Sequence, residues 1–470
     1  MRADEKILAL DATALGQRLR ARELSPVEVA QAYLARIEAT EPRLNAYITV
    51  TAETALEQAR AAEREIAAGR WRGPFHGVPV ALKDLLYTKG IRTTGGSKVL
   101  DDFVPDFDAT AWARLKAAGA VLLGKLNMHE FAMGGTSDNP HYGTVHNPYD
   151  TRRIPGGSSG GSAAAVVAKS ALATLGTDTL GSIRLPAALC GCVGLKPTYG
   201  RVSRFGVIAD GYSLDHVGPI TRSVRDAALM LNVIAGHDPN DATSSHRPVP
   251  DFTAGLDANL RGIRVGVLRE LTDWVDADIA AGFDRAIAIL AGLGARIEPV
   301  SVPALHLGLA ATFVIARAEG LDYHGGWLGE RQDRYGQATR RLLEGAMTIP
   351  ALAYIRACKA RAAIAREVER ALDGRSALVA PTTAIAAPEI GQETVAAPDG
   401  SRAPVVKKLV PLTAPFDATG HPALAVPSGV TPAGLPLSIQ IIGRAFDEAS
   451  VLSLGHAFEA ARGPMPEPAI

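Results

Sequence analysis

The sequence predicts an α/β protein, because short apolar segments alternate with helical patterns along the chain. Residues 77–84 form the pattern of a short buried strand with a charged end, a helix is expected over 109–118, and a strand over 120–124. Elements of this length and order are typical of α/β domains, in which catalytic groups follow the ends of strands. We expect an N-terminal helical arm over 1–70 and a single domain over 71–470.

The remaining elements follow from periodicity and capping residues. In the arm, Ser25 is a predicted N-cap, with Pro26 at the first helical position and Glu28 three residues after the serine. Further elements are expected as follows: helices over 52–68, 161–170, 183–189 and 223–235, a strand over 171–176, a helical elaboration over 304–372, and an exposed loop over 387–408.

Composition narrows the class of protein. The chain has 470 residues, 47% of them hydrophobic, which is enough for a sizeable core. Basic and acidic residues both number 49, so bulk charge gives no argument for nucleic acid or an anionic membrane. Cys190, Cys192 and Cys358 give neither a disulfide framework nor zinc-site spacing. With no signal peptide or membrane span predicted, we expect a soluble cytoplasmic protein that binds neither nucleic acid nor membrane.

A glycine–serine loop is the most unusual stretch of the chain. Residues 156–162 are all Gly or Ser, but they lack both the Gly-Lys-Ser/Thr of a P-loop and the spaced glycines of a dinucleotide fingerprint. Glycines allow unusual backbone torsions and close approach, here around Ser158. A second serine, Ser182, follows in GTDTLGSIR, and Lys83 lies upstream in VALKD. We interpret these three side chains as one site that cleaves an amide-like bond.

The serine nucleophile of such a site needs a base. The chain has no Gly-x-Ser-x-Gly elbow, and we expect His129, His141, His146 and His216 to be structural or substrate-lining. A buried neutral lysine can act as the base instead, because burial lowers its pKa.

Backbone amides are the expected donors to an oxyanion. Residues 179–182 lead into a predicted helix, where free N–H groups are available. Asp178 and Arg184 flank this turn, and we expect them to form a structural ion pair.

At this point several motifs resemble one family. GGSSGGSAAAV with LGTDTLGSIRLPAALCGCVGLKPTYGRVS is similar to the amidase signature family of serine hydrolases. VPVALKDL, GKLNMHEFAMGG, NPYDTRRIPGGSSGGS and LPLSIQIIGRAFDEASVL resemble the same family in the same order, so the resemblance covers roughly 70–460.

The resemblance implies a large mixed, twisted sheet covered by helices on both sides, and a Ser–cis-Ser–Lys triad. Ser182 would be the nucleophile, and Ser158, across a cis peptide, would bridge it to the base Lys83. An acyl-enzyme would form without a metal or a cofactor. The other implied positions are the oxyanion amides of Thr179, Leu180, Gly181 and Ser182, the substrate-lining Ala132, Met133 and Gly134, and Ser159, which orders the hydrogen-bond network.

One position departs from the family pattern. Leu180 stands where the family usually has glycine, and a non-glycine residue does not easily hold a positive φ. We expect the leucine to reshape the acyl pocket with activity retained.

The functional prediction is an amidohydrolase acting on a small amide, carbamate (a urethanase) or urea, as a monomer or homodimer. One alternative is the A subunit of a tRNA-dependent glutamine amidotransferase, although the usual Asp-Gln-x-Gly-Pro reads Asp215-His216-Val217-Gly218-Pro219 here. The other alternative is a non-catalytic homologue.

Overall fold

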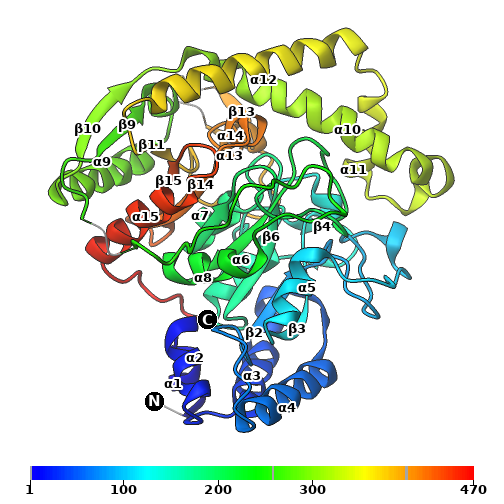
Figure 1. Ribbon diagram of the computed structural model, residues 1–470. Coiled ribbons are helices and arrows are strands. Elements are labelled where there is room, and N and C mark those ends of the chain that lie inside the picture. Colours follow the sequence, from blue (N-terminus) through cyan, green and yellow to red (C-terminus); the bar gives the residue numbers. More distant parts are fainter. Residues whose placement is uncertain (1–2, 257–258, 397–400) are drawn as a thin grey trace.

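A mixed sheet forms the centre of the protein (Figure 1). The computed structural model describes residues 3–256, 259–396 and 401–470, and in these ranges the sheet has eleven strands in the order β1-β3-β2-β6-β8-β7-β14-β15-β11-β9-β10. The strands are β1 (Tyr47–Val50), β2 (Pro79–Lys83), β3 (Val121–Leu126), β6 (Ala173–Asp178), β7 (Val193–Lys196), β8 (His216–Thr221), β9 (Arg264–Leu268), β10 (Arg296–Val300), β11 (Ala377–Pro381), β14 (Ala423–Val430) and β15 (Pro436–Ile442). Two small ribbons pair β4 (Asp138–Asn139) with β5 (Gly143–Thr144) and β12 (Thr394–Ala396) with β13 (Arg402–Pro404).

Strand direction changes across the sheet. β3, β2 and β6 run parallel to one another, as do β11, β9 and β10, whereas the strands between these groups pair antiparallel. Every residue of β2, β3 and β6 is buried, which is why these segments read as apolar runs rather than as alternating patterns. β6 continues two residues beyond the predicted strand, so Asp178 is its last residue.

Helices cover both faces of the sheet, as the alternation of side chains along the strands shows. Ile220 and Ala425 face α6 and α7 in one buried cluster. Val217, Leu424 and Val426 point the other way, into the cluster that holds α8 and α15. The helices are α1 (Ala3–Leu8), α2 (Ala12–Arg20), α3 (Pro26–Leu44), α4 (Ala52–Ala67), α5 (Thr110–Ala117), α6 (Gly160–Val167), α7 (Arg184–Cys190), α8 (Val224–Ile234), α9 (Ala277–Gly292), α10 (Gly308–Glu330), α11 (Gln337–Ala346), α12 (Ala351–Leu372), α13 (Val406–Leu409), α14 (Ala414–Thr419) and α15 (Glu448–Arg462).

The N-terminal helices α1–α4 lie together at one end of the molecule, at the bottom of Figure 1. The predicted cap of α3 is confirmed, since the Ser25 side chain accepts from the amides of Val27 (3.0 Å) and Glu28 (3.4 Å). α3 and α4 pack against each other and on β3.

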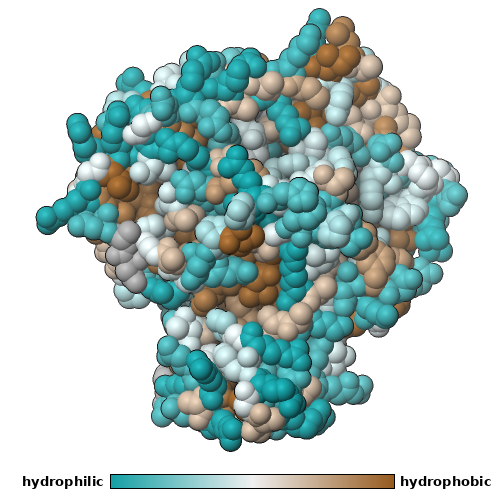
Figure 2. All heavy atoms as spheres, in the orientation of Figure 1, coloured by the Kyte–Doolittle hydropathy of each residue, from teal (hydrophilic) through white to brown (hydrophobic). Residues whose placement is uncertain are grey.

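The opposite end holds α10, α11 and α12, which agree with the helical character predicted for 304–372 (Figure 1). The stretch Pro303–Glu330 is long and apolar enough to cross a membrane by length and composition, but half of its most apolar window is buried inside the protein. Figure 2 shows a hydrophobic group over the start of α12, where Met347, Leu352 and Ile355 are exposed. Other hydrophobic groups on this face lie among hydrophilic residues.

The exposed loop predicted over 387–408 is confirmed in part, since residues 391–393, 401–402 and 406–407 are exposed, but the segment contains regular structure and a buried part that were not predicted. β12 and β13 pair there, and α13 begins at Val406. Ala387 and Val405 are buried in an apolar cluster with Leu185 and Leu409, so tertiary packing holds a segment whose local sequence has no clear period. Residues 397–400 of the prediction lie outside the described residues.

Candidate active site

Lys83 and Ser158 meet in the interior of the protein. Lys83 is the last residue of β2, and Ser158 follows a cis peptide bond after Gly157, as expected. Lys83 Nζ lies 2.6 Å from Ser158 Oγ and 2.8 Å from Thr177 Oγ1. Both Lys83 and Ser158 are fully buried. The end of β2, which carries Lys83, is therefore in direct contact with the glycine–serine loop, which carries Ser158.

Burial lowers the pKa of the Lys83 ammonium to about 7, because an apolar interior penalises the charged form. The carboxylates of Asp210, Asp215 and Asp178 oppose this shift. A lysine with such a pKa is partly neutral near pH 7, which is the state a general base requires.

The turn after β6 carries Ser182, which is 6% exposed and lies at the wall of a cavity. In the described part of the chain its hydroxyl makes no hydrogen bond, whereas its carbonyl accepts from the Ser159 amide (3.3 Å). Ser159 is further tied to β6, since its hydroxyl donates to the Thr177 carbonyl (3.2 Å). The segment that holds Ser158 is thus fastened beside the turn that holds Ser182.

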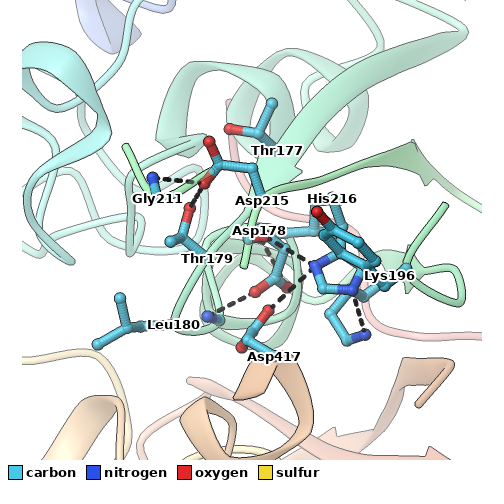
Figure 3. Close-up of polar contacts among 12 residues, drawn as sticks. Thr177, Asp178, Thr179, Leu180, Lys196, Gly211, Asp215, His216 and Asp417 are labelled. Carbon is cyan, nitrogen blue, oxygen red and sulfur yellow. Dashed lines mark hydrogen bonds and ion pairs between the residues drawn. The ribbon is translucent and has the colours of Figure 1, made fainter. Parts of the chain in front are cut away.

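Asp178 holds this turn from behind (Figure 3). Its carboxylate accepts from the amides of Gly181 (2.5 Å), Ile183 (3.2 Å) and Arg184 (3.3 Å), and from Arg184 Nε (3.0 Å). Arg184 also donates to Asp417 (2.6 Å), with all three charged groups fully buried. The ion pair predicted between Asp178 and Arg184 is confirmed, and Arg184 holds the pKa of the Asp178 carboxyl well below its ordinary value despite burial.

The predicted oxyanion amides differ in what they do. Gly181 donates to the Asp178 carboxylate, so its N–H is already engaged. The amides of Thr179, Leu180 and Ser182 have no protein acceptor among the described residues. Of these residues Leu180 and Ser182 line the cavity, whereas Thr179 is buried and does not.

Leu180 and Gly181 divide the conformational demands of the turn. Leu180 does not have a positive φ, so the strain that its side chain could have caused is absent. Gly181 carries the positive φ (+124°), and a Cβ there would lie 2.2 Å from Thr413 Oγ1. The Leu180 side chain packs against a buried apolar cluster that includes Ala311 and Ile315 of α10. Leucine is therefore accommodated one residue before the position that requires glycine.

The cavity beside Ser182 has a volume of about 690 Å³ and is lined mostly by apolar side chains. The predicted substrate-lining residues Ala132, Met133 and Gly134 are all on its wall. Its other lining residues are His129, Gly135, Thr136, Leu180, Leu185, Asp210, His306, Leu309, Ala310, Phe313, Arg317, Leu342, Val406, Lys407 and Val410.

The histidines near the motifs stay away from the Ser182 hydroxyl. His129 lines the cavity but faces Asp138 (3.3 Å), and His141 is paired with Glu130 (2.8 Å). His146 contacts the Thr151 carbonyl through Nδ1 (2.6 Å). His216 is buried, with Nδ1 3.3 Å from the Asp178 carbonyl.

Sequence reasoning missed several contributors. Thr177 contacts Lys83, and its hydroxyl could have been singled out from the motif GTD, where it comes directly before Asp178. Thr413, which donates to the Leu180 carbonyl (2.7 Å), lies more than 200 residues from it in the chain and had no local signal. The α10 and α13 side chains of the cavity likewise have no motif, because their position depends on packing.

Comparisons with known proteins identify the family to which the chain belongs. A family model described as amidase matches residues 28–452. The A subunit of glutamyl-tRNA(Gln) amidotransferase from Geobacter metallireducens is 45% identical, with 95% of this chain and 96% of that protein aligned. The corresponding protein of Trichlorobacter lovleyi is 44% identical over the same shares.

Solved structures of similar fold carry several names. The A subunit of glutamyl-tRNA(Gln) amidotransferase from Thermotoga maritima has a TM-score of 0.80 and 34% identity, covering 100% of this chain and 97% of that one. Another, reported as a vestigial protein complex that reveals the origins of an s-triazine catabolic enzyme, has a TM-score of 0.91 and 36% identity, covering 95% of this chain and 98% of that one. The native peptide amidase of Stenotrophomonas maltophilia has a TM-score of 0.86 and 35% identity, covering 98% of both chains.

Proposed function

Because the chain belongs to the amidase family, we propose that it cleaves the C–N bond of a carboxylic amide through an acyl-enzyme on Ser182. The observation that carries this proposal is the 2.6 Å contact between Lys83 Nζ and Ser158 Oγ in a fully buried setting, beside the turn that presents Ser182 to the cavity.

The proposed reaction begins with neutral Lys83. It takes the proton of Ser158 while Ser158 takes that of Ser182, and Ser182 Oγ attacks the substrate carbonyl. The amides of Thr179, Leu180 and Ser182 donate to the oxyanion, and the engaged Gly181 amide keeps the turn fixed. The C–N bond then breaks as the proton held by Lys83 returns through Ser158 to the leaving amine. Water attacks the acyl-enzyme by the same path and releases the acid and free Ser182.

The cavity favours an apolar substrate. Leu180, Leu309, Phe313 and Val410 present hydrocarbon next to Ser182, and burial of apolar groups contributes about 25 cal/mol per Å². We therefore propose amides with an aryl or alkyl group as the preferred substrates, together with carbamates and ureas that carry such groups. This main function needs no partner chain, and we expect a monomer or homodimer in the cytoplasm.

A second candidate is the A subunit of a tRNA-dependent glutamine amidotransferase. The observation in its favour is that the relatives at 44–45% identity over nearly the whole chain carry that name. On sequence relatives alone it stands ahead of the hydrolase, whereas the cavity lining supports the hydrolase. In this second function an acyl-enzyme would form on Ser182 from glutamine. The released ammonia would pass to a partner chain instead of into the solvent.

Purified chain separates the two candidates. The chain alone is assayed against anilides, alkyl amides, carbamates and glutamine, with Ser182→Ala as the matched variant. We expect hydrolysis of at least one apolar amide by the natural chain and none by the variant. The second candidate would be established if glutamine were the only compound hydrolysed and if its hydrolysis required added partner subunits and tRNA. A serine-directed fluorophosphonate that labels neither protein would leave a non-catalytic homologue.

A further inference from the structure

A buried polar cluster of Asp178, Lys196, His216 and Asp417 lies next to the turn 178–182, which carries Ser182. His216 has no part in the proposed reaction. His216 is the cross-strand partner of Asp178 in the β6–β8 ladder. Figure 3 shows the imidazole between Lys196 on one side and Asp178 with Asp417 on the other. All four side chains are at most 3% exposed, and none of them lines the cavity.

The contacts define which imidazole nitrogen carries the proton. Lys196 Nζ lies 2.5 Å from the His421 carbonyl, 3.2 Å from the Pro197 carbonyl and 3.2 Å from His216 Nε2. Burial lowers the pKa of Lys196 to about 7, and in its charged form below that pH the three protons of the ammonium meet these three acceptors, so Nε2 accepts. On the other side His216 Nδ1 faces only oxygen, the Asp178 carbonyl at 3.3 Å and Asp417 Oδ1 at 3.6 Å. Nδ1 therefore carries the proton and donates.

Electrostatics agree with a neutral imidazole in this position. Burial and the adjacent Lys196 keep the pKa of His216 well below its ordinary value. Asp417 Oδ1 has no hydrogen-bond partner among the described residues and lies 3.6 Å from His216 Nδ1. A neutral imidazole thus supplies one donor and one acceptor in a fixed direction.

This placement clamps Asp178 at both ends. Its carboxylate holds the amides of Gly181, Ile183 and Arg184, and its carbonyl receives His216 Nδ1. Asp178 is the last strand residue before the turn, so any movement of its peptide group moves the amides that follow. Donors aimed at an oxyanion lose effect with small displacements.

We infer that His216 is a positioning residue for the oxyanion amides, which it aligns through the Asp178 peptide group. This inference rests on the proposed function. It predicts that a side chain with one donor and one acceptor can replace His216, whereas an apolar side chain of similar size cannot. Glutamine offers Oε1 to Lys196 and Nε2–H to the Asp178 carbonyl, and leucine offers neither.

The test measures the rate constant and the end-point of Ser182 labelling by a fluorophosphonate, which needs no natural substrate. His216→Leu is expected to reach the end-point of the natural chain with a rate constant lowered about ten- to hundredfold, since loss of one whole oxyanion donor costs about 10²- to 10³-fold. His216→Gln is expected to stay within about threefold of the natural chain. His324→Leu removes another fully buried imidazole and is expected to leave the rate constant unchanged.

Three results would overturn the inference: a His216→Leu rate equal to that of the natural chain, a His216→Gln rate as low as that of His216→Leu, or a loss confined to the end-point. If His216→Leu does not fold, His216→Met, whose unbranched apolar side chain is of similar volume, carries the same expectation. A natural chain that is not labelled at all would instead refute the proposed function, and this inference with it.

Discussion

The cavity has a polar floor and an apolar wall, and the two are built in different ways. The floor is formed by Lys83, Ser158 and the turn 178–182, of which only Leu180 and Ser182 line the cavity itself; all of these residues are buried except the half-buried Leu180. The wall is made by α10 and α13, where Phe313 is 42% exposed and Val406 is 47% exposed. Hydrogen bonds hold the floor residues in place, whereas apolar contacts form the wall. Substitutions in the floor should therefore alter kcat, and substitutions in the wall should alter substrate preference.

The largest effect is expected at the base. Lys83→Met keeps the apolar stem and removes the amine, so we expect kcat to fall about 10³-fold or more, as for loss of a member of a catalytic unit. Amide hydrolysis and fluorophosphonate labelling measure it, with the half-exposed Lys116→Met as the control. Near-natural rates in Lys83→Met would remove lysine from the mechanism.

The next effect concerns the turn of the floor. In Gly181→Ala the new Cβ would lie 2.2 Å from Thr413 Oγ1 at a positive φ, so the turn must shift. We expect kcat to fall about 10²-fold with little change in KM. Gly345→Ala, where no atom lies within 4 Å of the new Cβ, is the control and should behave as the natural chain. A fall in Gly181→Ala that is confined to KM would contradict this assignment.

The pH dependence of the floor should follow the Lys83 ammonium. The neutral form is the base, and its pKa is lowered to about 7, so kcat/KM should rise with pH below about 7 and level off above it. The carboxylate of Asp210 raises the pKa of Lys83, with Asp215 and Asp178 acting in the same direction. In Asp210→Asn the rising part of the kcat/KM profile should therefore lie at lower pH.

The matched control for that shift is Asp226→Asn, which neutralises a buried carboxyl that holds the Ala12 amide of α2 instead of facing the cavity. The rising part of its profile should coincide with that of the natural chain. A rising part that lies at higher pH in Asp210→Asn would show that a group other than Lys83 controls the rate.

The smallest effect is expected where floor and wall meet. Leu180→Gly enlarges the cavity without changing the number of backbone amides, so bulky acyl groups should gain roughly three- to tenfold in kcat/KM and small ones should lose a similar factor. A series of anilides of increasing acyl size measures this, and Leu342→Ala, on the same cavity from α11, tests the wall alone. Unchanged preference in Leu180→Gly would mean that the leucine does not contact the acyl group.

The sequence alone determined the α/β class, the Ser25 cap and the contact between Lys83 and Ser158. It could do so because periodicity, caps and glycine-rich turns are local, and because the motifs carry the family resemblance. The ion pair of Asp178 and Arg184 was also readable, since six residues separate the partners across one turn.

Only the tertiary structure decided the rest. It showed that Gly181, not Leu180, carries the positive φ, that the Gly181 amide is engaged by Asp178, and that Thr413 meets this turn from far along the chain. It also showed that Val406, exposed as the loop prediction expects, begins α13 and lines the cavity. These features depend on long-range packing and on where each amide points, and neither quantity is encoded in the local pattern of residues.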